Sequence, residues 1–73
     1  MHNRLMTQAE LSAEEIKTAR LSLGESQEVF GRRFGVDQST AHRWETEPPR
    51  RGPARLALRK FLNELAAKSE AAE

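Results

Sequence analysis

Apolar residues recur at helical spacing in several stretches of this chain, and capping or helix-breaking residues bound each stretch. In the first stretch Ser12 is a good N-cap, and Glu15 three residues later completes the pattern of a capping box. Apolar side chains then follow at intervals of three and four residues until Gly24, which favours a left-handed helix stop. The pattern predicts a helix over residues 13–23.

Two shorter helices are predicted next, separated by a tight turn. Ser26 caps the first of them, whose interior carries two phenylalanines one turn apart, and Gly35 ends it. Asp37 caps the second, predicted over residues 38–45, where an alanine and a tryptophan three positions apart form a narrow apolar stripe. Such a stripe is enough to hold a short helix on a core.

The last helix is predicted after a proline-broken loop. A pair of adjacent prolines cannot continue a helix, whereas Pro53 suits the first turn of a new one. We expect this helix over residues 53–67, with residues 68–73 fraying and residues 1–6 unassigned. The β-branched residues are few and never alternate, so no strand is predicted and the fold class is all-α. The apolar stripe of the last helix comprises Leu58, Phe61, Leu62 and Leu65.

The composition fits one small domain. A chain of 73 residues buries only about 60% of its unfolded surface, which allows a single core. There is no cysteine and the two histidines lie far apart, so neither a disulfide framework nor a metal site is expected. No apolar run approaches the roughly 20 residues of a membrane span, so we expect a cytoplasmic protein without membrane contacts. A glycine-rich phosphate loop and a catalytic triad are also lacking, so neither catalysis nor a cofactor is expected.

The net charge of +1 hides a strong asymmetry along the chain. Residues 1–31 carry three basic and five acidic side chains, residues 32–60 carry eight and three, and residues 61–73 carry one and three. The middle segment is therefore +5, between two segments of −2 each. A basic segment between acidic ends is typical of a small domain that meets a polyanion, although a solvated charged face would have the same composition.

Gly31 interrupts the middle of the second predicted helix, where glycine costs about 1 kcal/mol relative to alanine. We infer that the third helix approaches its backbone there, as in a helix-turn-helix, and that a larger side chain would push the two helices apart. Ala41 and Trp44 would then hold the third helix on the core. The face turned outward carries polar side chains, namely Asp37, Gln38, Ser39, His42, Arg43 and Thr46.

With these features the sequence resembles the Cro and phage-repressor type of helix-turn-helix domain, the XRE-like family. The matching segments are "ARLSLGESQEVFGRRFGVDQSTAHRWE" and, after the basic loop, "GPARLALRKFL". The resemblance covers about residues 12–65 and implies a compact bundle of four to five helices of the lambda-repressor-like type. It places an ordered core at about 12–67 and the helix-turn-helix at about 26–46, within one domain over residues 1–73.

The resemblance also implies how the chain would meet DNA. The third helix would be the recognition helix in the major groove, the start of the second would hold a phosphate, and Arg20 would form an ion pair with Glu45. Side-chain chemistry allows Gln38 to bind adenine and Arg43 to bind guanine, although each residue alone could be an ordinary exposed one. The candidates for reading bases are Gln38, Ser39, Thr40, His42 and Arg43, and those for binding phosphates are Ser26, Gln27, Thr46, Arg50 and Arg51.

Three positions depart from the family pattern. Glu25 stands where a leucine usually seals the core, Gly31 replaces a more common alanine, and Ala41 replaces a branched aliphatic residue. None of them lies on the face expected to read DNA. The departures therefore bear on the stability of a single copy more than on DNA binding.

The expected function is sequence-specific binding of double-stranded DNA by a transcriptional regulator. Lone domains of this family often act as homodimeric repressors or autorepressors at inverted repeats in promoters, including phage, mobile-element and anti-CRISPR-associated regulators. The apolar stripe of the last helix exceeds what the other helices are expected to cover, so part of it would meet a second copy. The alternative is an antitoxin of a toxin–antitoxin pair, whose acidic ends bind a basic protein partner and for which DNA binding is secondary.

Overall fold

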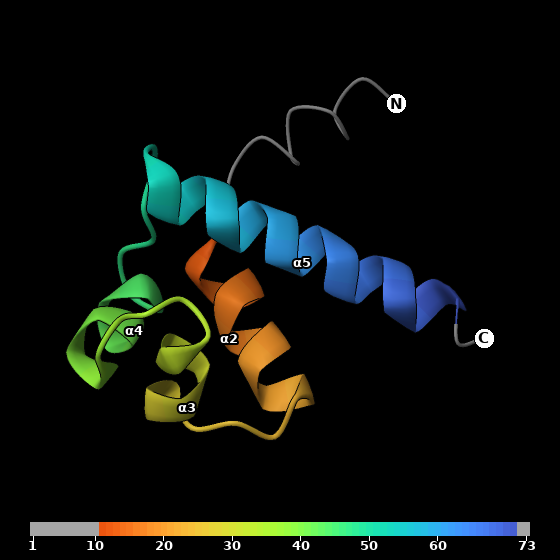
Figure 1. The fold of residues 1–73 in the computed structure, drawn as a ribbon, viewed down its shortest axis with the longest axis horizontal. Coiled ribbons are helices and arrows are strands. Elements are labelled where there is room, and N and C mark those ends of the chain that lie inside the picture. Colours follow the sequence, from red (N-terminus) through yellow and green to blue (C-terminus); the bar gives the residue numbers. More distant parts are fainter. Residues whose placement is uncertain (1–10, 72–73) are drawn as a thin grey trace.

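The computed structural model describes residues 11–71, the last three of them by their backbone alone. This range contains four helices, α2 (Ala13–Ser22), α3 (Gln27–Arg32), α4 (Gln38–Trp44) and α5 (Pro53–Ala71) (Figure 1). No residue of this range lies in a strand, so the all-α prediction is confirmed there. None of these helices is long and apolar enough to cross a membrane.

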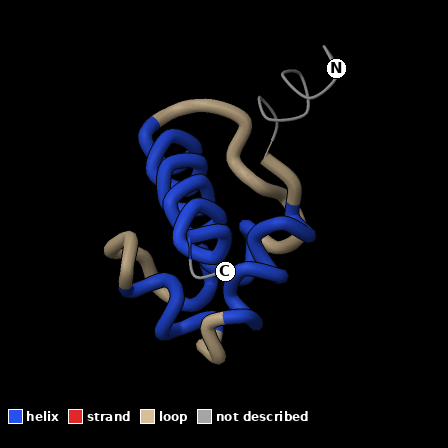
Figure 2. Tube along the Cα trace, turned by 90° about the vertical axis from the view of Figure 1, so that its right-hand side faces the viewer, coloured by secondary structure: helices blue, strands red, loops and turns tan. Residues whose placement is uncertain are grey.

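The long helix α5 runs along one side of the molecule, and the three shorter helices lie on the other side of the core (Figures 1 and 2). α2 packs against α5, and α3 packs against α4 across the short turn that joins them. All four helices contribute side chains to the core. Its buried members are Leu11, Ile16, Ala19, Phe30, Trp44, Leu58 and Leu62.

The helix boundaries follow the predicted capping signals. The side chains of Ser12, Ser26 and Asp37 each accept a hydrogen bond from the backbone N–H three residues later, at 3.0 to 3.2 Å. Gly24 and Gly35 have positive φ angles of 71° and 74° after α2 and α3, where the sequence predicts left-handed stops. The short local signals thus place the three short helices correctly.

The predicted capping box at the start of α2 is only half present. Ser12 caps the helix, but the Glu15 carboxylate accepts from Arg59 Nη2 at 2.5 Å, whereas a full capping box would turn it back to the Ser12 amide. The charge of an arginine on α5 is a stronger partner for this carboxylate than a neutral N–H. Glu15 therefore ties α2 to α5.

α5 is longer than the sequence predicts, since it continues to Ala71. Residues 68–71, predicted to fray, belong to the helix, because residues 63–71 contain no proline or glycine and are rich in strong helix formers. Residues 72–73, also predicted to fray, lie outside the described residues, as do residues 1–6, for which the sequence predicts no element.

Gly31 lies where α3 meets the turn into α4, and the predicted close approach is confirmed. A Cβ atom built there would lie 3.0 and 3.2 Å from the carbonyl oxygens of Val36 and Asp37, and 3.3 Å from the Cβ of Ala41. The Val36 N–H closes the same turn by donating to the Gly31 carbonyl at 3.0 Å. Because its nearest neighbours are backbone atoms, a side chain at Gly31 could be accommodated only by moving the turn.

The core covers only part of the apolar stripe of α5. Leu58 and Leu62 are buried, and Phe61 and Leu65 pack against the core while partly buried. The Phe61 ring lies edge-on to the two preceding phenylalanine rings, at centroid distances of 5.5 and 5.9 Å. The expectation that the other helices leave part of this stripe uncovered is therefore confirmed. Leu58 and Leu62 are the members that the core covers, and Phe61 and Leu65 stay partly exposed.

Gly31→Leu should lower the free energy of unfolding by about 2–3 kcal/mol, because the new side chain must displace the turn carbonyls. Gly31→Ala should change it by less than about 1 kcal/mol, because the gain in helix propensity offsets a small displacement. Val29→Leu adds bulk to an exposed position of the same helix and is the control. Urea denaturation followed by Trp44 fluorescence measures all three. A Gly31→Leu variant as stable as the control would contradict the close approach.

Candidate nucleic-acid interface

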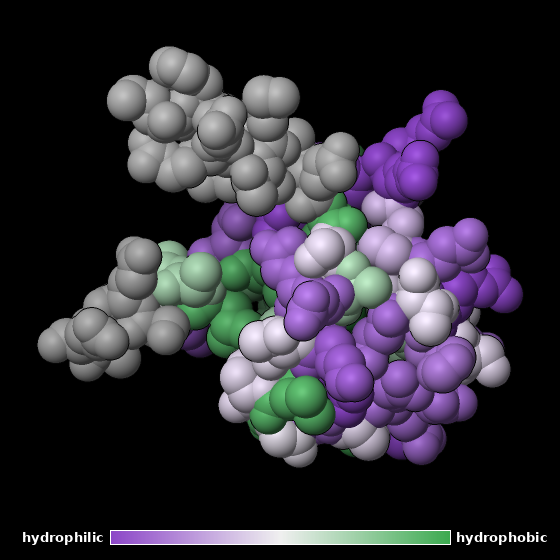
Figure 3. Space-filling model, turned by 180° about the vertical axis from the view of Figure 1, so that it is seen from behind, coloured by the Kyte–Doolittle hydropathy of each residue, from purple (hydrophilic) through white to green (hydrophobic). Residues whose placement is uncertain are grey.

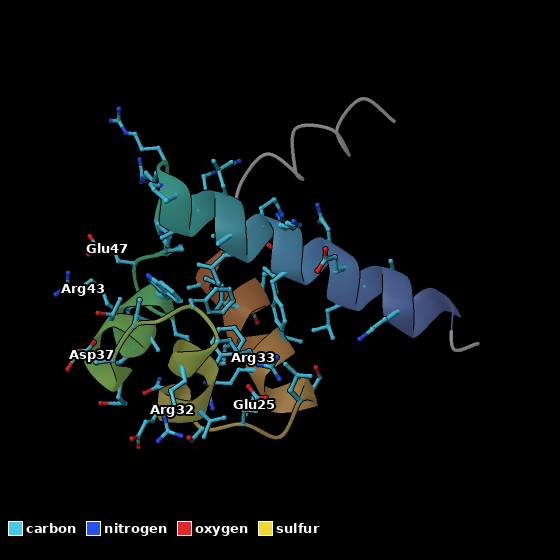
Figure 4. All side chains as sticks on the ribbon, in the orientation of Figure 1. Glu25, Arg32, Arg33, Asp37, Arg43 and Glu47 are labelled. Atoms are coloured by element: carbon cyan, nitrogen blue, oxygen red, sulfur yellow. The ribbon has the colours of Figure 1, made fainter. Side chains whose placement is uncertain are left out.

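The polar side of α4 is exposed, as expected of a reading face. Gln38, Ser39, His42 and Arg43 are exposed, and Thr40 is half-buried. On the opposite side of the helix the alanine and the tryptophan retain only 1% and 5% of their surface exposed. Figure 4 shows Arg43 extending away from the body of the molecule. The candidates for reading bases therefore lie together on one short helix whose other side is fixed in the core.

The candidates for binding phosphates lie around α4 at two places. Ser26 caps α3, and Gln27 is the first residue of that helix and is half-buried. Thr46 follows α4, and its hydroxyl donates to a carbonyl of the last turn of that helix at 3.0 Å. Arg50 and Arg51 are exposed in the loop between α4 and α5. The structure brings Thr46 and Arg50 together on the wall of one cleft.

A chain of hydrogen bonds links α2, α3 and α4 at the edge of this face. Arg20 donates through Nε to Glu45 Oε2 at 2.6 Å and through Nη2 to Oε1 at 3.2 Å, which confirms the predicted ion pair. Gln27 Nε2 donates to the same Oε1 at 3.3 Å, and Gln27 Oε1 accepts from Gln38 Nε2 at 2.8 Å. Gln27, the first residue of α3, thus holds Gln38, the first residue of α4, and Glu45 in turn holds Gln27.

The Arg20–Glu45 pair is largely removed from water, with 12% and 6% of the two side chains exposed. Arg20 also donates through Nη1 to the Glu25 carbonyl at 2.9 Å. Burial raises the pKa of the Glu45 carboxyl, but hydrogen bonds from Arg20 and Gln27 outweigh burial, so this pKa lies below its ordinary value. The hydrogen bond to Glu45 raises the pKa of Arg20. Both partners are therefore charged at neutral pH.

Glu25 forms an ion pair at the position where the resembled family has a leucine. Arg33 donates to its carboxylate through Nε at 2.9 Å and also through Nη2 (Figure 4). The guanidinium carbon of Arg33 lies 5.2 Å from the centre of the Phe61 ring. Hydrogen bonds from Arg33 hold the pKa of Glu25 below its ordinary value. The pair therefore covers the aromatic edge of the core, which a leucine would otherwise seal.

Most of the arginines fall into two groups, those that form an ion pair with a glutamate and those that do not. Four of them each pair with a glutamate, namely Arg20, Arg32, Arg33 and Arg59. Within residues 11–71, Arg43, Arg50 and Arg51 have no carboxylate at ion-pair distance. These three arginines lie on α4 and in the loop that follows it. Unneutralised positive charge therefore gathers beside the exposed face of α4.

Two carboxylates border the same face. Asp37 caps α4, and the backbone N–H of Thr40, assisted by the charge of Arg43, holds the pKa of Asp37 below its ordinary value. Glu47 is exposed in the loop after α4 (Figure 4). Because the Asp37 carboxylate occupies the N-terminus of α4, that helix end is closed to an anion. Phosphate contacts around α4 must come from other groups.

Two contacts beside the face are not predicted from the sequence, namely the Gln27–Gln38 hydrogen bond and the Glu25–Arg33 pair. For the first contact a signal was present, since a glutamine directly follows the N-cap residue in two successive helices. The second joins residues eight positions apart across a helix start, and neither periodicity nor capping chemistry indicates it.

Glu45→Gln should lower the free energy of unfolding at neutral pH by about 2–3 kcal/mol, because the buried Arg20 guanidinium loses its charged partner. A carboxyl whose pKa is lowered on folding stabilises the protein above its unfolded pKa, and this contribution disappears as the pH falls through the folded pKa. The natural chain should therefore lose stability below pH 4.5, the ordinary value, and the variant should lose less there.

Urea denaturation at a series of pH values from about 7 to about 3 measures this difference. Glu47→Gln, the same change at an exposed carboxylate, is the control and should follow the natural chain. Identical pH dependence of Glu45→Gln and the natural chain would contradict the role given to the pair.

Among the described residues, no group of three histidine, cysteine, aspartate or glutamate side chains could hold a metal ion.

Comparisons of the chain with family models, with curated proteins and with solved structures find no match. The functional conclusion therefore rests on the face itself. Its amides, hydroxyls and guanidinium groups are the side chains that donate hydrogen bonds to base edges and phosphates.

Proposed function

We propose that this chain is a sequence-specific regulator of transcription that binds double-stranded DNA through a helix-turn-helix of the XRE-like, lambda-repressor-like type. α3 and α4 form the helix-turn-helix, and α4 enters the major groove. One observation carries the proposal: the exposed side of α4 is entirely polar, while its other side is buried and its two ends are held by the Gln27–Gln38 hydrogen bond and the Arg20–Glu45 ion pair. A reading helix must be both accessible and held in one orientation.

The side-chain amide of Gln38 is restrained in a way that favours binding to an adenine. Its Nε2 uses one hydrogen in the bond to Gln27, which fixes the plane of the amide. The second hydrogen of Nε2 and the oxygen Oε1 remain available, and these are the two groups that meet adenine N7 and N6. The Gln27–Gln38 contact therefore restrains the amide and still leaves it one donor and one acceptor for the base.

Arg43 lies near the other end of α4 and extends into solvent (Figure 4). Its guanidinium can donate two hydrogen bonds to guanine O6 and N7. Ser39 and His42 lie on the same exposed side and can make further contacts to base edges, while half-buried Thr40 has a shorter reach. The proposed reading residues thus span the exposed length of α4.

Phosphates on either side of the groove are bound by groups outside α4. Arg50 and Arg51 supply unpaired positive charge in the loop after α4. Thr46 lies beside Arg50, and its hydroxyl would have to leave the Arg43 carbonyl to donate to a phosphate. At the start of α3, the Ser26 hydroxyl and the backbone of Gln27 supply hydrogen-bond donors. These contacts give affinity and register, and they weaken as salt increases.

The regulator acts in the cytoplasm as a homodimer on an inverted repeat, with half-sites about one helical turn apart. A two-fold axis that relates two copies relates their α4 helices as well, so a symmetric site follows from a symmetric dimer. Repression by occlusion of a promoter, including the chain's own promoter, is the mechanism that such a small domain can perform.

Arg43→Ala should remove most of the preference for one sequence while general affinity for DNA persists. The test compares affinity for a duplex that the natural chain selects from a random library with affinity for a scrambled duplex. The ratio of these two affinities should be about 10- to 100-fold smaller for the variant than for the natural chain. Lys60→Ala, a charge loss at an exposed position of α5, is the control and should keep the preference. Equal loss of affinity for both duplexes would contradict a base contact by Arg43.

The double variant Arg50→Ala, Arg51→Ala should weaken binding to the selected and the scrambled duplex alike. If each arginine neutralises one phosphate, the slope of log affinity against log salt should become about 2 units less steep. Fluorescence anisotropy over a range of salt concentrations measures the slope. An unchanged slope would place these arginines away from the DNA.

A further inference from the structure

The C-terminal part of α5 runs past the rest of the molecule (Figure 1). α5 has 19 residues, yet none of its described side chains beyond Leu62 is buried. Apolar side chains gather where this part of the helix leaves the body (Figure 3). This part of the helix thus carries apolar surface, at Leu65, Ala66 and Ala67, that the described residues do not bury.

Leu65 borders two grooves at this end of α5. One groove lies between α2 and α5 and includes Ala19, Leu62 and Ala66. The other runs along α5 and is lined by Phe61, Glu64, Leu65, Ala67 and Lys68. Phe61 and Leu65 are the two members of the apolar stripe that the core leaves partly exposed. Both grooves therefore meet at the uncovered part of the stripe.

The rim of the second groove carries one charge of each sign. Glu64 and Lys68 are exposed, and neither has an ion-pair partner within the described residues. When two helices pair antiparallel about a point near Ala66, residue 64 of each copy faces residue 68 of the other. The groove is therefore complementary to itself in charge, which is the requirement for an interface with two-fold symmetry.

We propose that two copies of this chain pair through the C-terminal halves of α5, antiparallel and centred near Ala66. Glu64 of each copy faces Lys68 of the other. On one flank of this contact Leu65 packs beside Leu65 of the other copy, and on the other flank the small side chains of Ala67 meet, which lets the helices approach closely. This pairing rests on the proposed function, since it identifies the dimer surface of that regulator.

The position of this surface suits a dimer that binds DNA. The C-terminal half of α5 points away from α4 (Figure 1), so pairing there leaves both α4 faces uncovered. Residues 61–73 carry one basic and three acidic side chains, a composition that disfavours contact with a polyanion at this end of the chain. Association and DNA binding therefore use separate parts of the chain.

Two charge reversals test the pairing by sedimentation of the full chain without DNA. Glu64→Lys alone and Lys68→Glu alone each place like charges across both contacts, so each should weaken self-association by about tenfold or more. An equal mixture of the two variants should restore association to the level of the natural chain, because every contact in the mixed dimer again joins opposite charges. Effects within one helix cannot produce this recovery. Lys60→Glu is the control, since the same reversal on α5 outside the paired region should not change association.

The natural chain should sediment as a reversible dimer between about 1 and 100 µM, and circular dichroism verifies that each variant is folded. A dimeric natural chain whose variants associate equally well, or whose mixture does not recover, overturns this surface and leaves the regulator to dimerise elsewhere. A strictly monomeric natural chain overturns the pairing and the inverted-repeat dimer together. Neither result changes the sequence preference that Arg43 is expected to give on a single half-site. A failure of DNA recognition can therefore be distinguished from a failure of the pairing.

Discussion

The ion pair between Arg20 and Glu45 is the interaction on which the position of α4 depends. α4 has seven residues and buries two of them, which is too little length and too little apolar area to fix a helix alone. The pair joins the C-terminal end of α4 to α2, and Gln27 extends the link to the first residue of α4. Because Gly31 lets the turn approach α3, both ends of α4 are held. A short helix fixed at both ends presents its outer side chains in one orientation.

The same constraint explains how charge is divided over the surface. Arginines that stabilise the fold are neutralised by glutamates on neighbouring elements, as with Arg33 and Glu25 or Arg59 and Glu15. The arginines beside α4 have no such partner among the described residues. Their charge is not neutralised by an ion pair, so it remains available to a polyanion. Stability and binding therefore depend on different arginines, and substitutions can separate the two.

The features that could be predicted from the sequence are local ones. Ser26, Asp37 and Gly35 act within a few residues of themselves, so helix starts and stops follow from capping chemistry and backbone conformation. Gly31 predicts the close approach of α3 and α4, because a glycine lowers the stability of a helix and a close neighbour explains why one is present there. Which members of the α5 stripe the core covers, and the pairing of Glu25, could not be predicted, because both depend on how helices distant in sequence lie against one another. The exposed face of α4 was predictable, whereas the hydrogen bonds that orient Gln38 were not.

Methylation interference on a duplex selected from a random library tests the central claim most directly, because guanine N7 lies in the major groove and adenine N3 in the minor groove. The duplex is methylated sparsely, and the bound and free fractions are compared base by base. If α4 reads the major groove in a symmetric dimer, methylation at guanine N7 should prevent binding at two symmetry-related positions about one helical turn apart. Equal methylation of both fractions at every guanine N7, or interference confined to adenine N3, would contradict recognition by α4.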